Sequence, residues 1–470
     1  MPDAVYLRCI DPACEKTSDL SSTAYACGAC GALLDVAYDW DRLPVPGTLR
    51  FFAERWAGRH QPLDFSGVWR FREFLPFAAP DEMVTIGEGQ TVLQSPDPAA
   101  LGLALRRGHL HFQYEGLNPS GSFKDNGMAA ALTMARRLGR RRVACASTGN
   151  TSASLAMFAS LTRSADDRPM QGIVFVGAGK IAYGKLSQAL DHGALTLQID
   201  GDFDACMKRI REAADRLGLY IVNSINPFRL EGQKAIMYRV LEGLGWEPPD
   251  WIVVPGGNLG NTSAFGKAFI ELAELGLIQR LPQIAVVNAA GANTLSELVT
   301  HRGLSWNRGY WEKAAVQSYY DELSASGRTA HTVATAIEIA RPVNLPKALR
   351  TLEAMDGVVC EVTDEEILDD KARIGRVGFG CEPASAAALA GLRQLLRRGV
   401  IDSSARVACV LTGHALKDSA ATVAYHTGET METMAGRRPT DLPPLANRPI
   451  RVADDLDAIC AAIDARTEKD

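Results

Sequence analysis

The sequence predicts an α/β fold with parallel-type sheets flanked by helices, preceded by a cysteine-rich, ribbon-like head. Three observations predict it. Short runs of β-branched residues alternate with amphipathic stretches from about residue 85 onward, as expected when helices cover a mostly parallel sheet. Polar loops rich in Gly, Ser and Asn follow several of these runs. Four of the ten cysteines lie within the first thirty residues.

The head, residues 1–47, carries Cys9, Cys14, Cys27 and Cys30 in the spacing C-x4-C-x12-C-x2-C. Thiolates at this spacing can surround a tetrahedral zinc ion, because each pair lies on one tight turn. Since the head contains no His, a bound zinc would be enclosed by four Cys and would be structural. The alternatives are a ribbon that has lost its metal, or plain buried thiols.

The predicted strands are short and apolar, and they cover residues 142–146, 173–176, 195–199, 220–222, 251–254, 284–287, 358–362 and 407–411. Helices are predicted after Lys124, from near Thr151, over 185–190 and 263–275, and in the last twenty residues from Ile450. Residues 432–450 are rich in Pro and polar residues, which indicates a linker or surface strap. Because parallel sheets bind ligands at the carboxyl ends of their strands, the loops after these strands are the candidate sites.

Composition excludes several classes of protein. The chain has 50 Lys and Arg and 55 Asp and Glu, which gives a net charge of −5 over 470 residues. We therefore expect no broad cationic face for binding nucleic acid. Residues 143–162 are uncharged, but their many hydroxyl and amide groups argue against a membrane span. Charged residues within the first ten positions argue against a secretory signal. We therefore expect a cytoplasmic protein.

The first candidate site is Lys124 in the segment NPSGSFKD, residues 118–125. Turn residues precede this lysine, and an almost uncharged helix follows it as far as Arg136. These surroundings indicate a partly desolvated amine, whose lowered pKa frees its lone pair for Schiff-base chemistry. A solvated surface lysine is the alternative.

Two further loops are candidate anion sites at helix starts. STGNTSAS, residues 147–154, follows a strand and is rich in hydroxyls; a helix capped by Thr148 or Asn150 is the alternative. GGNLGNT, residues 256–262, also joins a strand to a helix, although an ordinary tight turn would look the same. It matches neither the dinucleotide fingerprint nor the P-loop, which argues against NAD and ATP.

Polar side chains also follow the strands that end near 222 and 411. Asn223, Ser224 and Arg229 suit an anionic substrate, with Arg supplying a bidentate fork, although a surface turn is the alternative. Thr412 can meet a ring nitrogen from its strand end. His414 is interpreted as a loop histidine with satisfied hydrogen bonds, since nothing nearby pairs it with a nucleophile.

Six segments follow one another along the chain: NPSGSFKD, STGNTSAS, NSINPFRLEGQK, GGNLGN, CEPASAA and TGHALKD. In this order they resemble the motifs of the threonine synthases, within the tryptophan-synthase β family of fold type II pyridoxal-phosphate enzymes. The resemblance covers most of the chain. It implies a two-lobe fold with a large cofactor-binding lobe, residues 48–135 and 231–430, and a small mobile lobe, residues 136–230. Residues 431–470 would form a C-terminal strap and helix.

The resemblance also implies roles for individual residues. Lys124 takes the place of the Schiff-base lysine, Asn150 contacts the 3-hydroxyl of pyridoxal phosphate, and Thr412 lies at its pyridine nitrogen. The loop that wraps the cofactor phosphate corresponds to Gly257, Asn258, Leu259, Gly260 and Asn261. The substrate phosphate is held by residues like Ser147, Thr151, Asn223, Ser224 and Arg229. The implied reaction converts O-phosphohomoserine and water to threonine and phosphate, and the family habit is a homodimer.

Three alternatives remain at this point. A cysteate synthase would use phosphoserine and sulfite with the same cofactor and lysine. Threonine or serine dehydratases would leave the Asn223–Arg229 anion site unexplained, because their substrates carry no phosphate. A binding protein that keeps the fold without catalysis is the third alternative, and the lysine with two anion loops argues against it.

Overall fold

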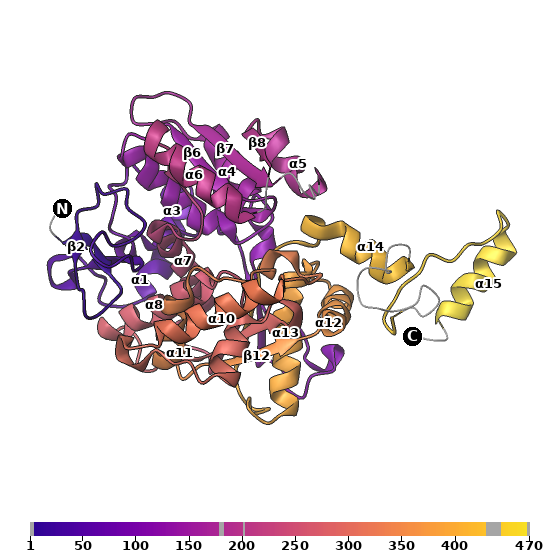
Figure 1. Ribbon diagram of the computed structural model, residues 1–470. Coiled ribbons are helices and arrows are strands. Elements are labelled where there is room, and N and C mark those ends of the chain that lie inside the picture. The colour runs from indigo at the N-terminus through magenta and orange to yellow at the C-terminus, as the bar shows by residue number, and fades with distance from the viewer. Residues whose placement is uncertain (1–3, 178–182, 201–202, 429–442, 468–470) are drawn as a thin grey trace. The chain divides into compact units, whose positions relative to one another are not determined.

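The computed structural model describes residues 4–177, 183–200, 203–428 and 443–467 (Figure 1). The chain forms two compact units, which divide between Asp418 and Ser419. The first unit contains three sheets, two of them built from parallel strands flanked by helices. The predicted α/β fold and the ribbon-like head are therefore confirmed.

The larger sheet has six strands in the order β12-β11-β10-β13-β5-β4. Its strands are β4 Leu93–Gln94, β5 Leu110–Tyr114, β10 Trp251–Pro255, β11 Gln283–Ala289, β12 Val358–Val362 and β13 Val407–Leu411. All pairs are parallel except β4 with β5. The sequence did not predict β4 and β5, because β5 places His111 and Gln113 inside an otherwise apolar buried run.

Helices cover both faces of this sheet. Phe265 and Phe269 of α8 share an apolar cluster with Val286 of β11. The next residue of β11, Val287, faces the opposite side, where a side chain on Gly391 of α13 would collide with it. The helices associated with the larger sheet and the head are α1 Arg50–Arg55, α2 Pro62–Phe65, α3 Lys124–Arg137, α7 Pro227–Gly243, α8 Gly260–Glu274, α9 Thr294–Ser296, α10 Lys313–Ser326, α11 Leu345–Ala354, α12 Asp364–Arg376 and α13 Pro383–Arg397.

The smaller sheet is wholly parallel, with the order β8-β7-β6-β9. It is built from β6 Arg142–Ala146, β7 Gln171–Gly177, β8 Leu195–Ile199 and β9 Tyr220–Ile221, with helices α4 Asn150–Leu161, α5 Tyr183–Asp191 and α6 Phe203–Leu217. Neighbouring residues of β6 pack against different helices. Val143 belongs to the apolar cluster that contains Phe158 of α4, whereas Ala144 belongs to the one that contains Ile210 of α6. Because consecutive side chains of a strand point to opposite faces of its sheet, α4 and α6 cover opposite faces.

The head forms a three-stranded antiparallel sheet, with the order β2-β1-β3. Its strands are β1 Val5–Cys9, β2 Thr17–Ser18 and β3 Leu34–Tyr38. Ion pairs and a hydrogen bond join the head to α11 and α7. Asp35 lies 2.7 Å from both Lys347 Nζ and Arg350 Nη2, and Tyr38 Oη donates to Glu231 over 2.6 Å.

The second unit contains α14 Ser419–Thr427 and α15 Leu456–Thr467. The predicted last helix is therefore confirmed, although it begins after Ile450. Of the predicted strap, residues 432–442 lie outside the described residues, and residues 443–450 form neither helix nor strand. None of the described helices is both long enough and apolar enough to cross a membrane.

Candidate active site

The predicted site residues follow the carboxyl ends of strands in both parallel sheets. Lys124 begins α3 after β5, Asn150 begins α4 after β6, and Thr412 directly follows β13. The strand end at Thr412 also fixes the lysine loop, because Phe123 N donates to Thr412 O over 2.9 Å and Ser122 forms a bridge with Gly413. Lys124 and Thr412 are thus held on adjacent backbone segments.

Lys124 has the electrostatic surroundings of a reactive amine. Burial, together with the positive charge of Arg229, lowers the pKa of Lys124 to about 7, while the negative charge of Glu382 acts in the opposite direction. Its Nζ lies 4.1 Å from the centre of the Phe123 ring, and the residue keeps only partial exposure. The structure therefore excludes the alternative of a freely solvated surface lysine.

Asn150 and Thr412 meet at one buried carboxylate. Asn150 Nδ2 donates to both oxygens of Glu382, over 3.1 and 2.9 Å, and Thr412 Oγ1 lies 3.4 Å from Glu382 Oε1. Thr412 Oγ1 is also 3.0 Å from Ser385 Oγ. Gly149, and not Thr148 or Asn150, occupies the N-cap position of α4, without a side-chain capping bond. The alternative of a capping Thr148 or Asn150 is therefore wrong.

Glu382 and Ser385 were missed as site residues by the sequence analysis. Both belong to the segment CEPASAA, which contributed to the resemblance without a role for either side chain. The sequence does contain a signal for Glu382. This acidic residue directly precedes Pro383, the first residue of α13, and a carboxylate at the start of an Ala-rich, buried helix needs a partner. Burial raises the pKa of Glu382.

The Gly-rich loop after β10 has the backbone of an anion site. α8 begins at Gly260, and Leu259 adopts a left-handed conformation with φ 62°, which is uncommon for a residue with a side chain. The first N–H groups of a helix have no partner within it. Asn261 Oδ1 and Thr262 Oγ1 are buried and find no hydrogen-bond partner among the described residues. A Cβ at Gly257 would lie 3.0 Å from Ile337 Cα, so a side chain there would crowd the backbone of the neighbouring segment.

Asn344 connects this loop to the segment after β9. Its backbone N–H donates to Asn258 O over 3.2 Å, and its Nδ2 donates to Ser224 O over 3.0 Å. Asn223 instead pairs with β6: its Oδ1 accepts from Ala146 N at 3.0 Å and its Nδ2 donates to Ala146 O at 2.9 Å. The structure therefore brings the loops after β6, β9 and β10 together.

The loop rich in hydroxyl side chains after β6 leads directly into α4. Ser147 Oγ accepts from Gly149 N over 3.2 Å. Thr151 is the second residue of α4, where the backbone N–H groups have no partner within the helix. Ser154, one turn later, donates to Asp125 over 2.6 Å, which ties α4 to the residue after Lys124. His414 lies on the neighbouring loop, where its Nδ1 accepts from Leu416 N, as expected for a loop histidine.

Arg229 is the least expected feature of this site, because its guanidinium is buried and incompletely paired. The residue is 1% exposed. Its Nη1 donates to Val222 O over 2.8 Å, whereas Nε and Nη2 find no hydrogen-bond partner among the described residues. A Cβ at Gly127 of α3 would lie 3.3 Å from Arg229 Nε, so glycine allows the guanidinium to approach the lysine helix. Burial lowers the pKa of Arg229 to about 10. A surface turn, the alternative for this segment, is excluded.

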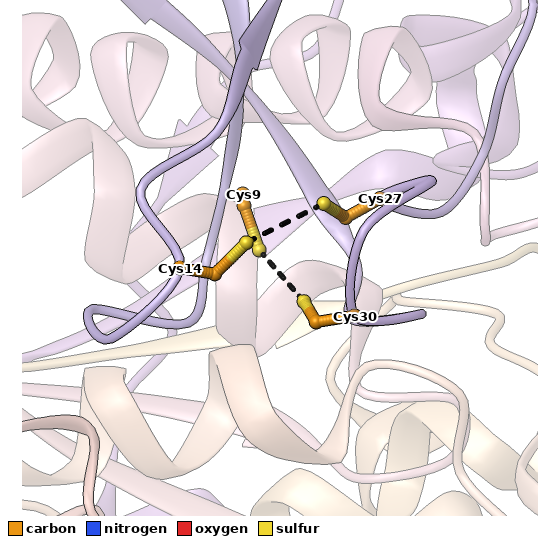
Figure 2. Close-up of side chains that lie close together, drawn as sticks. All are labelled: Cys9, Cys14, Cys27 and Cys30. Atoms are coloured by element: carbon orange, nitrogen blue, oxygen red, sulfur yellow. Dashed lines mark hydrogen bonds between the residues drawn. The ribbon is translucent and has the colours of Figure 1, made fainter.

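The four cysteines of the head converge as predicted. Cys9 Sγ lies 3.5 Å from Cys30 Sγ, and Cys14 Sγ lies 3.7 Å from Cys27 Sγ (Figure 2). All four sulfur atoms lie within 4.8 Å of one another. A tetrahedron with Zn–S bonds of about 2.3 Å has S–S edges of about 3.8 Å, so the cluster has the dimensions of a four-thiolate zinc site. Cys9 and Cys14 are separated by four residues, and Cys27 and Cys30 by two, but all four sulfur atoms still come together.

Known proteins carry the same combination of sequence and fold. The family model of pyridoxal-phosphate dependent enzymes matches residues 84–413. Threonine synthase of Methanocaldococcus jannaschii is 38% identical over 417 residues, covering 88% of this chain and 94% of that protein. The chain belongs to the threonine synthase family of pyridoxal-phosphate-dependent enzymes.

Other members of this family show how far the similarity extends. Threonine synthase of Mycobacterium tuberculosis is 39% identical over 365 residues, covering 76% of this chain and 90% of that protein. The crystal structure of threonine synthase from Escherichia coli has a TM-score of 0.60 and 19% identity, covering 98% of this chain and all of that chain. At this identity the last comparison establishes the fold alone.

The residues present fit the cofactor of the family. The surroundings of Lys124 lower the pKa of its amine to about 7, as a Schiff-base lysine requires. The start of α8 offers free N–H groups and buried polar atoms for a phosphate. Thr412, with Ser385 behind it, supplies a neutral hydroxyl group and not a carboxylate for a ring nitrogen.

Proposed function

We propose that this enzyme converts O-phosphohomoserine and water to L-threonine and phosphate, the last step of threonine biosynthesis. The observation that carries this proposal is the incomplete pairing of Arg229. Its buried Nε and Nη2 have no hydrogen-bond partner among the described residues, and its charge acts on Lys124. A buried guanidinium without a partner is costly unless a ligand pairs with it. Because the loop at 257–261 is a separate anion site, the chain can hold two phosphates at once.

We assign the first of these sites to the cofactor. Lys124 would carry pyridoxal phosphate, with Asn150 at its 3-hydroxyl and Thr412 at its ring nitrogen. Its phosphate would be held by Gly257, Asn258, Leu259, Gly260 and Asn261. When bound, pyridoxal phosphate withdraws electrons from the carbons of an attached amino acid and so makes their protons acidic.

Lys124 then moves protons on the substrate. With a pKa near 7, its amine is divided between the neutral and protonated forms at neutral pH, so it can both accept and donate a proton. Lys124 takes the proton from Cα and also acts at Cβ, because one mobile amine reaches both carbons. The Cγ–O bond breaks and its electrons leave with the phosphate. The protons taken from Cα and Cβ return to Cα and Cγ, so Cγ becomes the methyl group, and water adds its hydroxyl at Cβ and gives its proton to the phosphate.

The second anion site would hold the substrate phosphate. Arg229 supplies the charge-assisted hydrogen bonds, which are stronger than neutral ones. We assign to the same site Ser147 on the loop after β6, Thr151 at the start of α4 and Ser224 on the loop after β9. Asn223 holds the loop after β9 to the end of β6 through Ala146. We further propose that the lobe at 136–230 closes on this phosphate, so that water enters only when it is needed.

Product analysis tests the proposal. The holoenzyme is offered O-phosphohomoserine in one arm and O-phosphoserine with sulfite in another, and the amino-acid product is identified by mass spectrometry beside free phosphate. We expect threonine and phosphate from the first arm, and a loss of about a hundredfold or more in Lys124→Ala. Cysteate from the second arm, without threonine from the first, would contradict the assigned substrate but not the role of Lys124.

We also propose that Cys9, Cys14, Cys27 and Cys30 bind one structural zinc ion, supported by their S–S distances. A cytoplasmic homodimer is the proposed assembly, and it rests on the family resemblance and on the finding that the described cysteines form no disulfide. Metal analysis tests the first proposal, and the mass of the particle in solution tests the assembly.

A further inference from the structure

The head also reaches the smaller sheet, through one tyrosine. Tyr25 lies two residues before Cys27, and its Oη accepts a hydrogen bond of 2.7 Å from the backbone N–H of Ile221. Its ring packs near Tyr220, with the two ring centres 6.3 Å apart. Tyr25 also packs against the apolar cluster that contains Ala144 and Ile221. The head therefore contacts both lobes.

The N–H of Ile221 needs this partner because β9 is an edge strand. Within the part of the chain that the structure describes, β9 pairs with β6 alone. The next N–H, that of Val222, donates to Ala144 O of β6 over 2.9 Å. Successive residues of a strand point their N–H groups in opposite directions, so the N–H of Ile221 points to the open edge. The hydroxyl of Tyr25 satisfies a donor that the sheet itself leaves unpaired.

From the same end of β9, hydrogen bonds continue to Arg229. Ile221 O accepts from Asn226 Nδ2 over 2.9 Å. Asn226 Oδ1 in turn accepts from Phe228 N over 3.0 Å and caps α7. Val222 O accepts from Arg229 Nη1 over 2.8 Å. The carbonyl of Ile221 thus fixes the start of α7, and the carbonyl of the next residue, Val222, fixes the guanidinium.

We propose that Tyr25 is a positioning residue for the substrate-phosphate site. Its hydroxyl holds the end of β9, and β9 holds the orientation in which Arg229 presents Nε and Nη2. The inference rests on the proposed role of Arg229. It gives the head a function beyond docking: Asp35 and Tyr38 attach it to the larger lobe, and Tyr25 connects it to the anion site of the smaller one.

Tyr25→Phe tests this proposal, because it removes one oxygen and keeps the ring. We expect KM for O-phosphohomoserine to rise about three- to tenfold with kcat changed less than about twofold, the size of one lost hydrogen bond. Amide hydrogen exchange at Ile221 should become faster, while the absorbance of the bound cofactor stays unchanged. Tyr6→Phe is the matched control, since Tyr6 lies on β1, which pairs with β2 and β3 and not with β9.

A double-mutant cycle separates positioning from general stability. In an Arg229→Gln background, Tyr25→Phe should change KM by less than about twofold, because its effect passes through the missing guanidinium. An equal effect in both backgrounds would overturn the proposal, and so would an unchanged KM in Tyr25→Phe with only a lower thermal midpoint.

The affinity of the holoenzyme for inorganic phosphate, measured by calorimetry, keeps this test independent of the proposed reaction. Weaker phosphate binding in Tyr25→Phe supports the positioning role even if O-phosphohomoserine is not the substrate. Unchanged phosphate binding together with unchanged exchange at Ile221 would overturn the role of Tyr25, even in an enzyme that produces threonine.

Discussion

Asn150 donates its side-chain amide to both carboxylate oxygens of Glu382, over 3.1 and 2.9 Å. The same carboxylate lies 3.4 Å from Thr412 Oγ1, and its charge acts on Lys124. One buried side chain therefore links the three groups that we assign to the cofactor ring. Glu382, which is 4% exposed, opposes the effects of burial and of Arg229 on the pKa of Lys124.

Glu382→Gln should lower the pKa of Lys124. The carboxylate favours the protonated amine, so its loss leaves burial and Arg229 to lower the pKa further below about 7. Only the neutral amine captures the cofactor aldehyde, so capture by the apo-protein should reach half its maximal rate at a lower pH than in the wild type. Stopped-flow absorbance across pH measures this midpoint.

Glu361→Gln is the control for this change. Glu361 lies on β12, where its carboxylate accepts from Asn293 Nδ2. A midpoint that stays the same in Glu382→Gln, or that moves to higher pH, would show that Glu382 is not charged beside Lys124.

Arg229→Gln should have the opposite effect on the amine. Loss of the guanidinium charge raises the pKa of Lys124, so the midpoint of cofactor capture moves to higher pH. KM for O-phosphohomoserine should rise about tenfold to a hundredfold, since a charge-assisted fork is lost. Steady-state kinetics and the capture profile measure both effects in one variant. Arg280→Gln, which removes an arginine paired with the half-exposed Asp250, should change neither; a normal KM in Arg229→Gln would refute the anion site.

Removal of metal from the head should destabilise the protein. Purified protein is expected to contain one zinc ion per chain, and a strong chelator should release it and lower the thermal midpoint. Four thiols should then react with a thiol reagent in addition to those that react before chelation. Cys30→Ser, at the exposed ligand, should weaken metal retention in the same assays. Metal-free protein with an unchanged thermal midpoint would favour plain thiols.

Asp35→Ala should cost about 3 to 5 kcal/mol of unfolding free energy, because it leaves the buried Lys347 without its partner. Burial alone would raise the pKa of Asp35, but neighbouring cations, Arg350 foremost, hold it well below its usual range. The ion pair therefore stabilises the fold above a pH of about 4, and its contribution is lost as pH falls through the folded-state pKa. Denaturant unfolding at neutral and acidic pH should show a difference between wild type and variant that shrinks in acid.

Much of the architecture could be predicted from local pattern. β6, β8, β12 and β13 lie where short runs rich in apolar residues predict strands, because such runs are visible in the local sequence. β5 could not be recognised, because His111 and Gln113 interrupt its apolar residues, and its pairing with β13 and β4 depends on the tertiary structure.

Part of the site could also be predicted from local pattern. Lys124 and the loops follow strand ends, and topology brings strand ends together. Nothing local indicates that Asn150 would meet Glu382, because 232 positions separate them in the chain. The same holds for Tyr25 and Ile221. Hydrogen bonds between distant segments depend on how elements pack, and a single sequence does not encode them as a pattern.

The most direct test of the proposed reaction is its oxygen balance. Holoenzyme is given O-phosphohomoserine in water labelled with heavy oxygen, and threonine and phosphate are analysed by mass spectrometry. Cleavage of the Cγ–O bond and addition of water at Cβ predict one heavy oxygen in threonine and none in the released phosphate. Heavy oxygen in the phosphate, with homoserine as the other product, would mean simple phosphate hydrolysis and would contradict the account.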